Sequence, residues 1–272
     1  METMVIREKQ DLTYLKWDHI RSSSGTAGTF LKSESTIGPK KVYYKLSNFN
    51  SVEGIVGHEC VNEIIVDRLL TVLGVEHLHY QLVYADVKID GLTFTTYVCR
   101  SEDFKEKGES KVPLYDYYRV NAKAGESHYD FCVRNGWKQY IDEMLAVDYI
   151  ILNRDRHGAN VEVLRNSKKK TLRIAPLFDH GVSLLYSCKE EDVVGYDVME
   201  DRPCQNFIGS RSCYENLKLL DGRYVFKNEL KKTDKNFIFE DLDGVLSDER
   251  ISKIWEMIWK RYKKYMKLNE GM

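Results

Sequence analysis

The feature that most constrains the fold is a polar string, residues 153–160, that directly follows an apolar segment. Residues 137–152 carry apolar side chains over a broad helical face, which predicts a buried helix. The string itself reads Asn-Arg-Asp-Arg-His-Gly-Ala-Asn, and the strand-like residues 161–164 follow it. The charged and amide side chains therefore sit between two buried elements, where rigid structure can hold a site in place.

A second motif lies one predicted hairpin further along the chain. Residues 171–174 are strand-like and lead into Pro-Leu-Phe-Asp-His-Gly at 176–181. Pairing with the strand at 161–164 brings Asp179 back beside Asn160. One carboxylate and one amide oxygen suit Mg²⁺, which prefers hard oxygen ligands. This arrangement leaves Asp155 free to act as a general base.

Together the two motifs have the spacing of a phosphoryl-transfer site. Asp155 and Asn160 show the D-x-x-x-x-N spacing of a kinase catalytic loop, and Asp179 with Gly181 has the form of a D-F-G motif with His in the middle. A single Asp or Asn in a turn is more often a turn former than a ligand. The full string, followed by apolar-Asp-x-Gly, favours Asp155 as the catalytic base and Asn160 and Asp179 as Mg²⁺ ligands, with ATP as phosphate donor.

The order of predicted elements indicates an α+β, two-lobed, protein-kinase-like fold. Strands are expected at residues 41–46, 80–88 and 92–99, and helices at 58–73, 137–152 and 248–268. Asp90-Gly91 is a strong hairpin signal, Gly74 a helix stop, and Ser247 an N-cap candidate. Residues 102–111 are charged and are expected to form a linker or exposed loop. We predict a β-rich N-lobe, residues 1–100, and a mainly helical C-lobe, residues 101–272, with ATP between them.

A lysine and a carboxylate are expected to contact the phosphates. Lys45 lies on a predicted strand, from which its ammonium can reach the α- and β-phosphates. Its carboxylate partner should come from the helix at 58–73, where Glu59 and Glu63 lie four residues apart on one face. Glu63 is the first choice and Glu59 the reserve.

Backbone groups are expected to complete the nucleotide site. The glycines of a small-residue turn let N–H groups approach phosphate; the turn comprises Ser24, Gly25, Thr26, Ala27 and Gly28. Three residues at the seam between the lobes would hydrogen-bond adenine through their backbone, although a buried hydrophobic role for the cysteine is equally plausible; they are Val98, Cys99 and Arg100. His157 is placed beside the nucleotide as an orienting, structural histidine.

Composition excludes several classes of protein. The formal net charge of −1 argues against a general nucleic-acid-binding surface. The longest apolar runs are too short to span a membrane, and the N-terminus does not resemble a secretory signal. Six scattered cysteines without a CxxC pair predict reduced thiols, a cytoplasmic protein and no structural zinc. Delivery of the chain to another cell remains open.

The two motifs resemble those of the HipA-like serine/threonine kinases, which resemble the phosphatidylinositol kinases in their D-R-H-x-x-N loop. The likeness covers nearly the whole chain: residues 25–29 lie where the family's phosphate loop would be, Lys45 where its ATP lysine would be, and residues 58–63 open the first helix in a similar way. The resemblance implies transfer of the ATP γ-phosphate to a serine or threonine of a protein. The phosphate loop begins near residue 22, so we expect a compact, kinase-only form. The family's antitoxin and DNA partnerships are therefore not carried over to this chain.

Three other interpretations compete with this one. A lipid or small-molecule kinase would use the same residues, and a nucleotide-binding pseudokinase would lack a base or a metal ligand. Residues 237–246 resemble the D-x-D-G motif of haloacid-dehalogenase phosphatases, but too few residues follow them to form that fold. The hydroxyls of residues 22–29 suggest self-phosphorylation, and residues 190–212 are expected to hold the acceptor-binding segment.

Overall fold

The computed structural model describes residues 4–18, 30–221 and 225–270. Its largest sheet has five strands in the order β1-β6-β7-β3-β2. These strands are β1 (Val5–Asp11), β2 (Lys32–Ile37), β3 (Lys40–Lys45), β6 (Tyr80–Ile89) and β7 (Leu92–Glu102). β1 runs parallel to β6 and the other pairs are antiparallel. A further small pair, β4 (Phe49–Asn50) and β5 (Gly54–Ile55), lies between β3 and the first helix in sequence.

The hairpin predicted around Asp90-Gly91 is confirmed. β6 and β7 pair from Tyr80 opposite Ser101 to Ile89 opposite Leu92. Asp90 and Gly91 have φ angles of 49° and 86°, as the two central residues of a type I′ turn require. The hairpin places β7 at the centre of the sheet, between β6 and β3.

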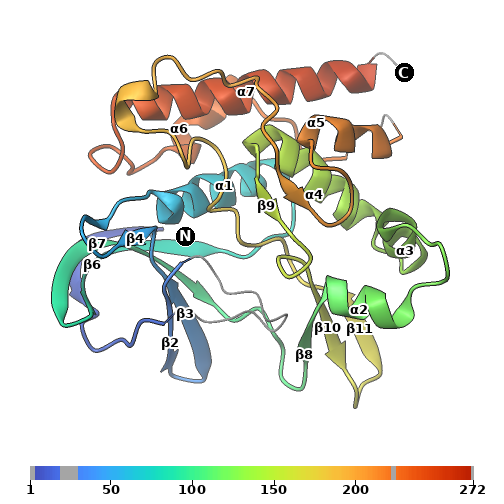
Figure 1. The fold of residues 1–272 in the computed structure, drawn as a ribbon, viewed down its shortest axis with the longest axis horizontal. Coiled ribbons are helices and arrows are strands. Elements are labelled where there is room, and N and C mark those ends of the chain that lie inside the picture. Colours follow the sequence, from blue (N-terminus) through green and yellow to red (C-terminus); the bar gives the residue numbers. More distant parts are fainter. Residues whose placement is uncertain (1–3, 19–29, 222–224, 271–272) are drawn as a thin grey trace.

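Helix α1 (Glu59–Leu73) connects the sheet to the helical part of the chain (Figure 1). It begins after His58 and ends at Gly74, whose φ of 74° closes the last turn. Nearly all of its side chains are buried, because one face contacts β6 and β7 and another contacts later helices. Its apolar residues belong to the same large core as those of the later helices, whereas the opposite face of the sheet has a smaller core of its own.

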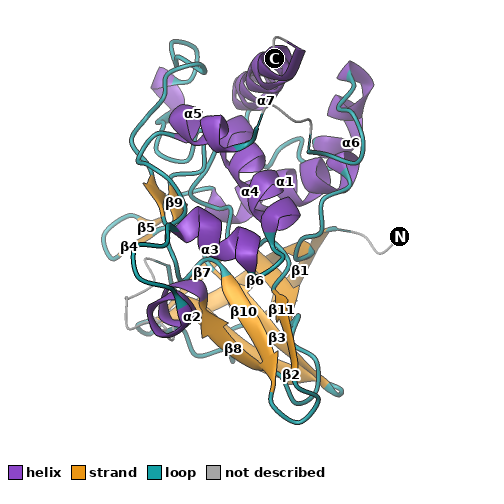
Figure 2. Ribbon diagram, turned by 90° about the vertical axis from the view of Figure 1, so that its right-hand side faces the viewer, coloured by secondary structure: helices purple, strands orange, loops and turns teal. Residues whose placement is uncertain are grey.

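The remaining helices follow the sheet in the chain and gather on one side of it (Figure 2). They are α2 (Leu114–Asn121), α3 (His128–Arg134), α4 (Lys138–Ile151), α5 (Cys213–Asn216), α6 (Lys235–Ile238) and α7 (Asp248–Glu270), with 3₁₀ turns at Glu190–Asp192, Leu217–Leu219 and Lys232–Asp234. α4 packs against α7. Ser247 caps α7 by accepting a hydrogen bond from the Arg250 N–H (3.1 Å).

Two small sheets complete the fold. β8 (Ser110–Pro113), β10 (Glu162–Asn166) and β11 (Thr171–Ile174) form one in the order β11-β10-β8, and β9 (Asp155–Arg156) pairs with β12 (Gln205–Asn206) in the other. The predicted β10–β11 hairpin is confirmed. The expectation of an exposed loop over 102–111 is partly wrong, because β7 extends to Glu102 and β8 begins at Ser110. Glu109 is buried there, with its carboxylate 2.8 Å from the Arg173 guanidinium.

The predictions about thiols and membrane spans can be compared with the described residues. All six cysteines lie in this part of the chain, and none forms a disulfide. No helix within the described ranges is long and apolar enough to cross a bilayer.

Candidate active site

The polar string begins where α4 ends. Leu152 takes a left-handed conformation (φ 51°), which ends the helix and turns the chain into residues 153–160. The Asn153 side chain then joins two parts of the turn. Its Nδ2 donates to Asp148 Oδ1 (2.9 Å) and its Oδ1 accepts from the Asp155 N–H (3.1 Å). The last turn of a buried helix therefore positions Asp155.

Arg156 holds the two motifs together. Its guanidinium is fully buried and pairs with the Asp148 carboxylate, with Nε and Nη2 each 3.0 Å from a carboxylate oxygen. Its Nη1 donates to the carbonyls of both Asn160 (3.1 Å) and Phe178 (2.9 Å). One side chain thus joins α4, the end of the polar string and the residue before Asp179.

Asn160 is oriented by its own loop. Its Nδ2 donates to the Asp155 carbonyl (2.8 Å) and its N–H to the His157 carbonyl (2.9 Å). The side-chain Oδ1 has no hydrogen bond within the described ranges, so it is available as a ligand. His157 stays close, with Nε2 3.8 Å from Asp155 Oδ1 and Nδ1 accepting from the Ala159 N–H.

Lys45 occupies the centre of a carboxylate cluster. Its Nζ lies 3.0 Å from Glu63 Oε1 and 2.5 Å from Asp179 Oδ1. The three residues come from β3, α1 and the segment after β11, so the contact joins the sheet, the first helix and the second motif. Glu59, the reserve partner, instead accepts a hydrogen bond from the Asn48 N–H (3.1 Å). Glu59 and Glu63 lie on the same helical face, so their spacing in the sequence could not show which of them pairs with Lys45.

The charges of Lys45 and Asp179 support one another, whereas burial and the charge of Asp179 raise the pKa of Glu63 although Lys45 opposes them. Burial alone would lower the pKa of Lys45, but the carboxylates of Asp179 and Glu63 outweigh it and hold that pKa well above its usual value. Burial would likewise raise the pKa of Asp179, yet Lys45, with Lys32 and Arg156, holds it below the ordinary range. The ammonium and the Asp179 carboxylate are therefore both charged at neutral pH.

Asp155 has the opposite shift. Burial raises its pKa and the negative charge of Asp179 adds to that effect, whereas His157 and Lys45 oppose it. A carboxylate with a raised pKa is a better proton acceptor than an ordinary aspartate. The two acidic residues of the motifs thus have their pKa values moved apart by their surroundings.

Helix α1 also fixes the backbone around Asp179. Asp179 adopts φ 59°, and its N–H donates to the Tyr80 hydroxyl (3.1 Å). The next N–H, of His180, donates to Glu63 Oε2 (2.8 Å), and Asn62 Nδ2 donates to the carbonyls of Gly181 and Ser183. The turn that carries Asp179 is therefore attached to the same helix that supplies the partner of Lys45.

The remaining predicted nucleotide contacts have two outcomes. Ser24, Gly25, Thr26, Ala27 and Gly28 lie outside the described residues. The prediction for residues 98–100 needs correction, because β7 is a central strand. Cys99 pairs with Lys45 on one side and Leu82 on the other, and Arg100 pairs with Tyr44 and Gln81. Val98 pairs with Val83 of β6 only, and Val98 and Cys99 are both buried. The chain leaves this sheet after Glu102.

A hollow of about 320 Å³ opens beside Asp155. Arg154 and Arg211 give it positive charge, and residues 203–205 form part of its wall. This wall belongs to the segment, residues 190–212, in which the sequence places acceptor binding. The lining residues are Phe30, Arg154, Asp155, Val182, Tyr186, Pro203, Cys204, Gln205 and Arg211.

Two residues that organise the site escaped the sequence interpretation. Asp148 is a buried acid on the apolar helix α4, and Tyr80 is the first residue of β6. The charge of Asp148 amid apolar neighbours was an available signal, because an unpaired charge is costly in a core. The role of Tyr80 had no local signal, since its hydroxyl reaches a residue 99 positions away.

Comparison with known proteins identifies the fold. No protein-family model matches the chain, and no curated protein matches it significantly. Among solved structures, the Helicobacter pylori proinflammatory kinase CtkA is similar, with a TM-score of 0.66 and 15% identity over 96% of each chain. A chain of the Shewanella oneidensis MR-1 complex of HipA, HipB and operator DNA has a TM-score of 0.44 and 13% identity, covering 93% of this chain and 60% of that one. WaaP, solved with acyl carrier protein, has a TM-score of 0.39 and 11% identity, covering 87% of this chain and 85% of that one. The likeness to CtkA confirms the prediction from sequence: the chain has a two-lobed, protein-kinase-like α+β fold.

Proposed function

We propose that this chain is an ATP- and Mg²⁺-dependent serine/threonine protein kinase. The observation that carries the proposal is the position of Lys45, whose ammonium lies between Glu63 on α1 and Asp179 of the second motif. Protein kinases need a strand lysine paired with a helix glutamate and an aspartate that holds metal at the same place. The kinase-like fold supports the proposal independently of these side chains.

The residues fit a magnesium ion. Asp179 supplies an ionised carboxylate. Asn160 supplies its side-chain Oδ1, because its Nδ2 already donates a hydrogen bond to the Asp155 carbonyl. Both are hard oxygen donors, and Mg²⁺ takes its other ligands from phosphates and water. When bound, the ion would neutralise charge on the phosphates of ATP. Lys45 would then bind phosphate oxygens while Glu63 keeps its ammonium oriented.

Asp155 is proposed as the residue that accepts the proton of the incoming hydroxyl. Its raised pKa suits that role, and it opens onto the hollow lined by Arg154 and Arg211. A serine or threonine side chain entering this hollow would present its hydroxyl to Asp155. The choice of a protein acceptor rests on the resemblance to HipA-like kinases, whereas the phosphate transfer rests on the residues.

The division of the chain into lobes belongs to the same proposal. We place the N-lobe at residues 1–100 and the C-lobe at 101–272, with ATP between them; β7 continues two residues past this boundary. The phosphates would meet residues 24–28, and adenine would meet the connection that follows Glu102. Self-phosphorylation within residues 22–29 would bring like charge beside ATP and inhibit the enzyme.

The test is label transfer from γ-labelled ATP with Mg²⁺, using the chain alone and with a cell extract. We expect transfer by the wild type and by the control Asp90→Asn, a change at an exposed residue of the β6–β7 turn where asparagine is equally suited. We expect none by Asp155→Asn or Asp179→Ala. Label on phosphoserine or phosphothreonine supports a protein kinase, whereas label only in lipids or small molecules supports the alternative acceptors. Transfer that survives both active-site changes contradicts the assignment. Mass mapping of residues 22–29 after incubation tests self-phosphorylation.

A further inference from the structure

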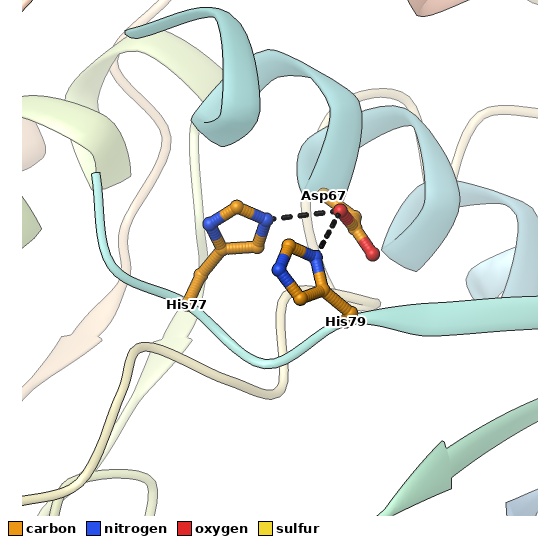
Figure 3. Close-up of side chains that lie close together, drawn as sticks. All are labelled: Asp67, His77 and His79. Atoms are coloured by element: carbon orange, nitrogen blue, oxygen red, sulfur yellow. Dashed lines mark hydrogen bonds and ion pairs between the residues drawn. The ribbon is translucent and has the colours of Figure 1, made fainter. Parts of the chain in front are cut away.

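Three potential metal ligands meet outside the proposed active site. Asp67 lies on α1, and His77 and His79 lie on the short connection from α1 to β6 (Figure 3). Asp67 Oδ1 is 2.9 Å from His77 Nε2 and 3.1 Å from His79 Nδ1. The three ligand atoms all lie within 4.8 Å of one another. Figure 3 shows both imidazole rings turned toward the carboxylate.

The hydrogen bonds of His77 require either a proton or a cation between its second ring nitrogen and Asp67. Its Nδ1 lies 2.7 Å from the Val75 carbonyl, which can only accept, so Nδ1 carries a proton. In a neutral imidazole the other nitrogen, Nε2, then has a lone pair, and this faces the Asp67 carboxylate. Thr71 Oγ1 lies further away, at 3.4 Å. Two lone pairs at 2.9 Å repel, and both side chains are buried, with exposures of 4% and 0%. Either a second proton on His77 or a bound cation resolves the conflict.

We propose that Asp67 Oδ1, His77 Nε2 and His79 Nδ1 bind a divalent transition metal of the zinc class. Carboxylate oxygen and imidazole nitrogen are ordinary ligands of such ions. The hydrogen bonds that the ligands make on their far sides are also typical of a metal site. The Val75 carbonyl accepts from His77 Nδ1 and so fixes the tautomer of that ring, and the Tyr80 N–H donates to Asp67 Oδ2 (2.7 Å).

The geometry leaves room for the ion. With metal–ligand bonds of about 2.0–2.1 Å, tetrahedral ligand atoms stand roughly 3.4 Å apart, so small outward shifts suffice. His79 can make such a shift because its side chain is 74% exposed. Its exposure also gives the ion a path from solvent and leaves the fourth position to water.

A metal here would fasten the part of the fold that carries the proposed active site. Asp67 lies one helical turn after Glu63 on α1. The connection that holds the histidines pairs with Leu177, through the Leu78 N–H to the Leu177 carbonyl (2.8 Å). Tyr80, at the end of the connection, accepts from the Asp179 N–H. The ion would therefore join α1 to the segment that supports Asp179. This proposal revises the sequence-based expectation of no structural zinc, which rested on the absence of a CxxC pair among the cysteines.

The experiment measures metal binding and does not depend on kinase activity. Chelator-treated, reduced protein carrying Asp179→Ala, so that the proposed magnesium site does not compete, is titrated with Zn²⁺ by calorimetry. Co²⁺ is then used as a spectroscopic probe of the ligands. His79→Ala, a change at an exposed side chain, is compared with the matched control His128→Ala. Circular dichroism of each variant verifies that it is folded.

We expect one equivalent of Zn²⁺ and a four-coordinate Co²⁺ spectrum without thiolate charge transfer. His79→Ala should weaken Zn²⁺ binding at least about tenfold, because loss of a residue that only hydrogen-bonds a metal ligand already lowers metal affinity that much. His128→Ala should leave the affinity unchanged. Absence of saturable binding overturns the proposal, and His77 and Asp67 are then an imidazolium–carboxylate pair. Equal binding by His79→Ala, or a thiolate band, overturns it as well because the ion is then elsewhere.

Discussion

Replacing Asp148 with asparagine should destabilise the protein strongly, although the two side chains have nearly the same shape. Arg156 is fully buried, and its guanidinium makes hydrogen bonds of 3.0, 3.0 and 3.4 Å to the Asp148 carboxylate. Asparagine keeps one oxygen acceptor but removes the charge, so the guanidinium is left buried without an anion. Breaking such a pair costs about 3–5 kcal/mol. That is a large share of a typical free energy of unfolding, about 5–15 kcal/mol.

The same contacts predict the behaviour of the double variant. Asp148→Asn with Arg156→Met removes the unpaired charge, so the double variant should be more stable than Asp148→Asn alone. It should not regain the full stability of the wild type, because the carbonyls of Asn160 and Phe178 lose the donor that Arg156 provides. Each buried acceptor left without a partner costs about 1–3 kcal/mol.

Urea unfolding followed by circular dichroism gives these free energies. The control is Glu215→Gln, which weakens a pair with Lys218 that is 50–68% exposed and should change the free energy of unfolding little. If Asp148→Asn costs no more than this control, the buried ion pair does not hold the loop. A double variant less stable than Asp148→Asn would also refute the reasoning, because removal of the charge would then have brought no relief.

Three other predictions concern the proposed active site and the last helix. Glu63→Gln should lower kcat/KM by roughly ten- to a hundredfold, since a charge-assisted hydrogen bond to Lys45 is worth about 1.5–3 kcal/mol. Glu59→Gln, on the same helical face, should change kcat/KM little, and equal losses in the two variants would contradict the pairing. The acid limb of kcat/KM against pH should lie above the ordinary aspartate pKa, because Asp155 must be ionised and burial raises its pKa; a profile flat down to about pH 4 would count against Asp155 as the base. Ser247→Ala should lower the free energy of unfolding by about 1 kcal/mol, measured by urea titration, because it removes the cap of α7.

Much of the fold and of the candidate site could be predicted from local patterns. Apolar spacing located α1, α4 and α7, and Asp90-Gly91 located the central hairpin, because burial of one helical face and a turn with positive φ leave direct signatures in the sequence. The spacing from Asp155 to Asn160, followed by one hairpin, predicted that the two motifs would lie together, and Arg156 joins the Asn160 carbonyl to the residue before Asp179. A hairpin joins neighbouring strands, so its geometry follows from a few adjacent residues.

Residues 98–100 show where such reasoning fails. The strand that contains them was predicted correctly. An alternating pattern in the sequence does not indicate, however, whether other strands pair with both sides of that strand. Cys99 and Arg100 pair with β3 on one side and β6 on the other, and only this pairing makes their backbone groups unavailable to a ligand. The parallel pairing of β1 with β6, across more than 60 residues, was likewise not visible in local patterns.

The sequence by itself determined the three main helices, the central hairpin and the choice of a kinase-like fold. Tertiary structure alone decided which of two equivalent glutamates meets Lys45, that Asp148 neutralises Arg156, and that Asp67 meets two histidines. The physical reason is that periodicity records whether a side chain is buried, whereas its partner depends on how separate elements pack. Contacts between residues far apart in the chain are set by that packing, and no local pattern specifies them.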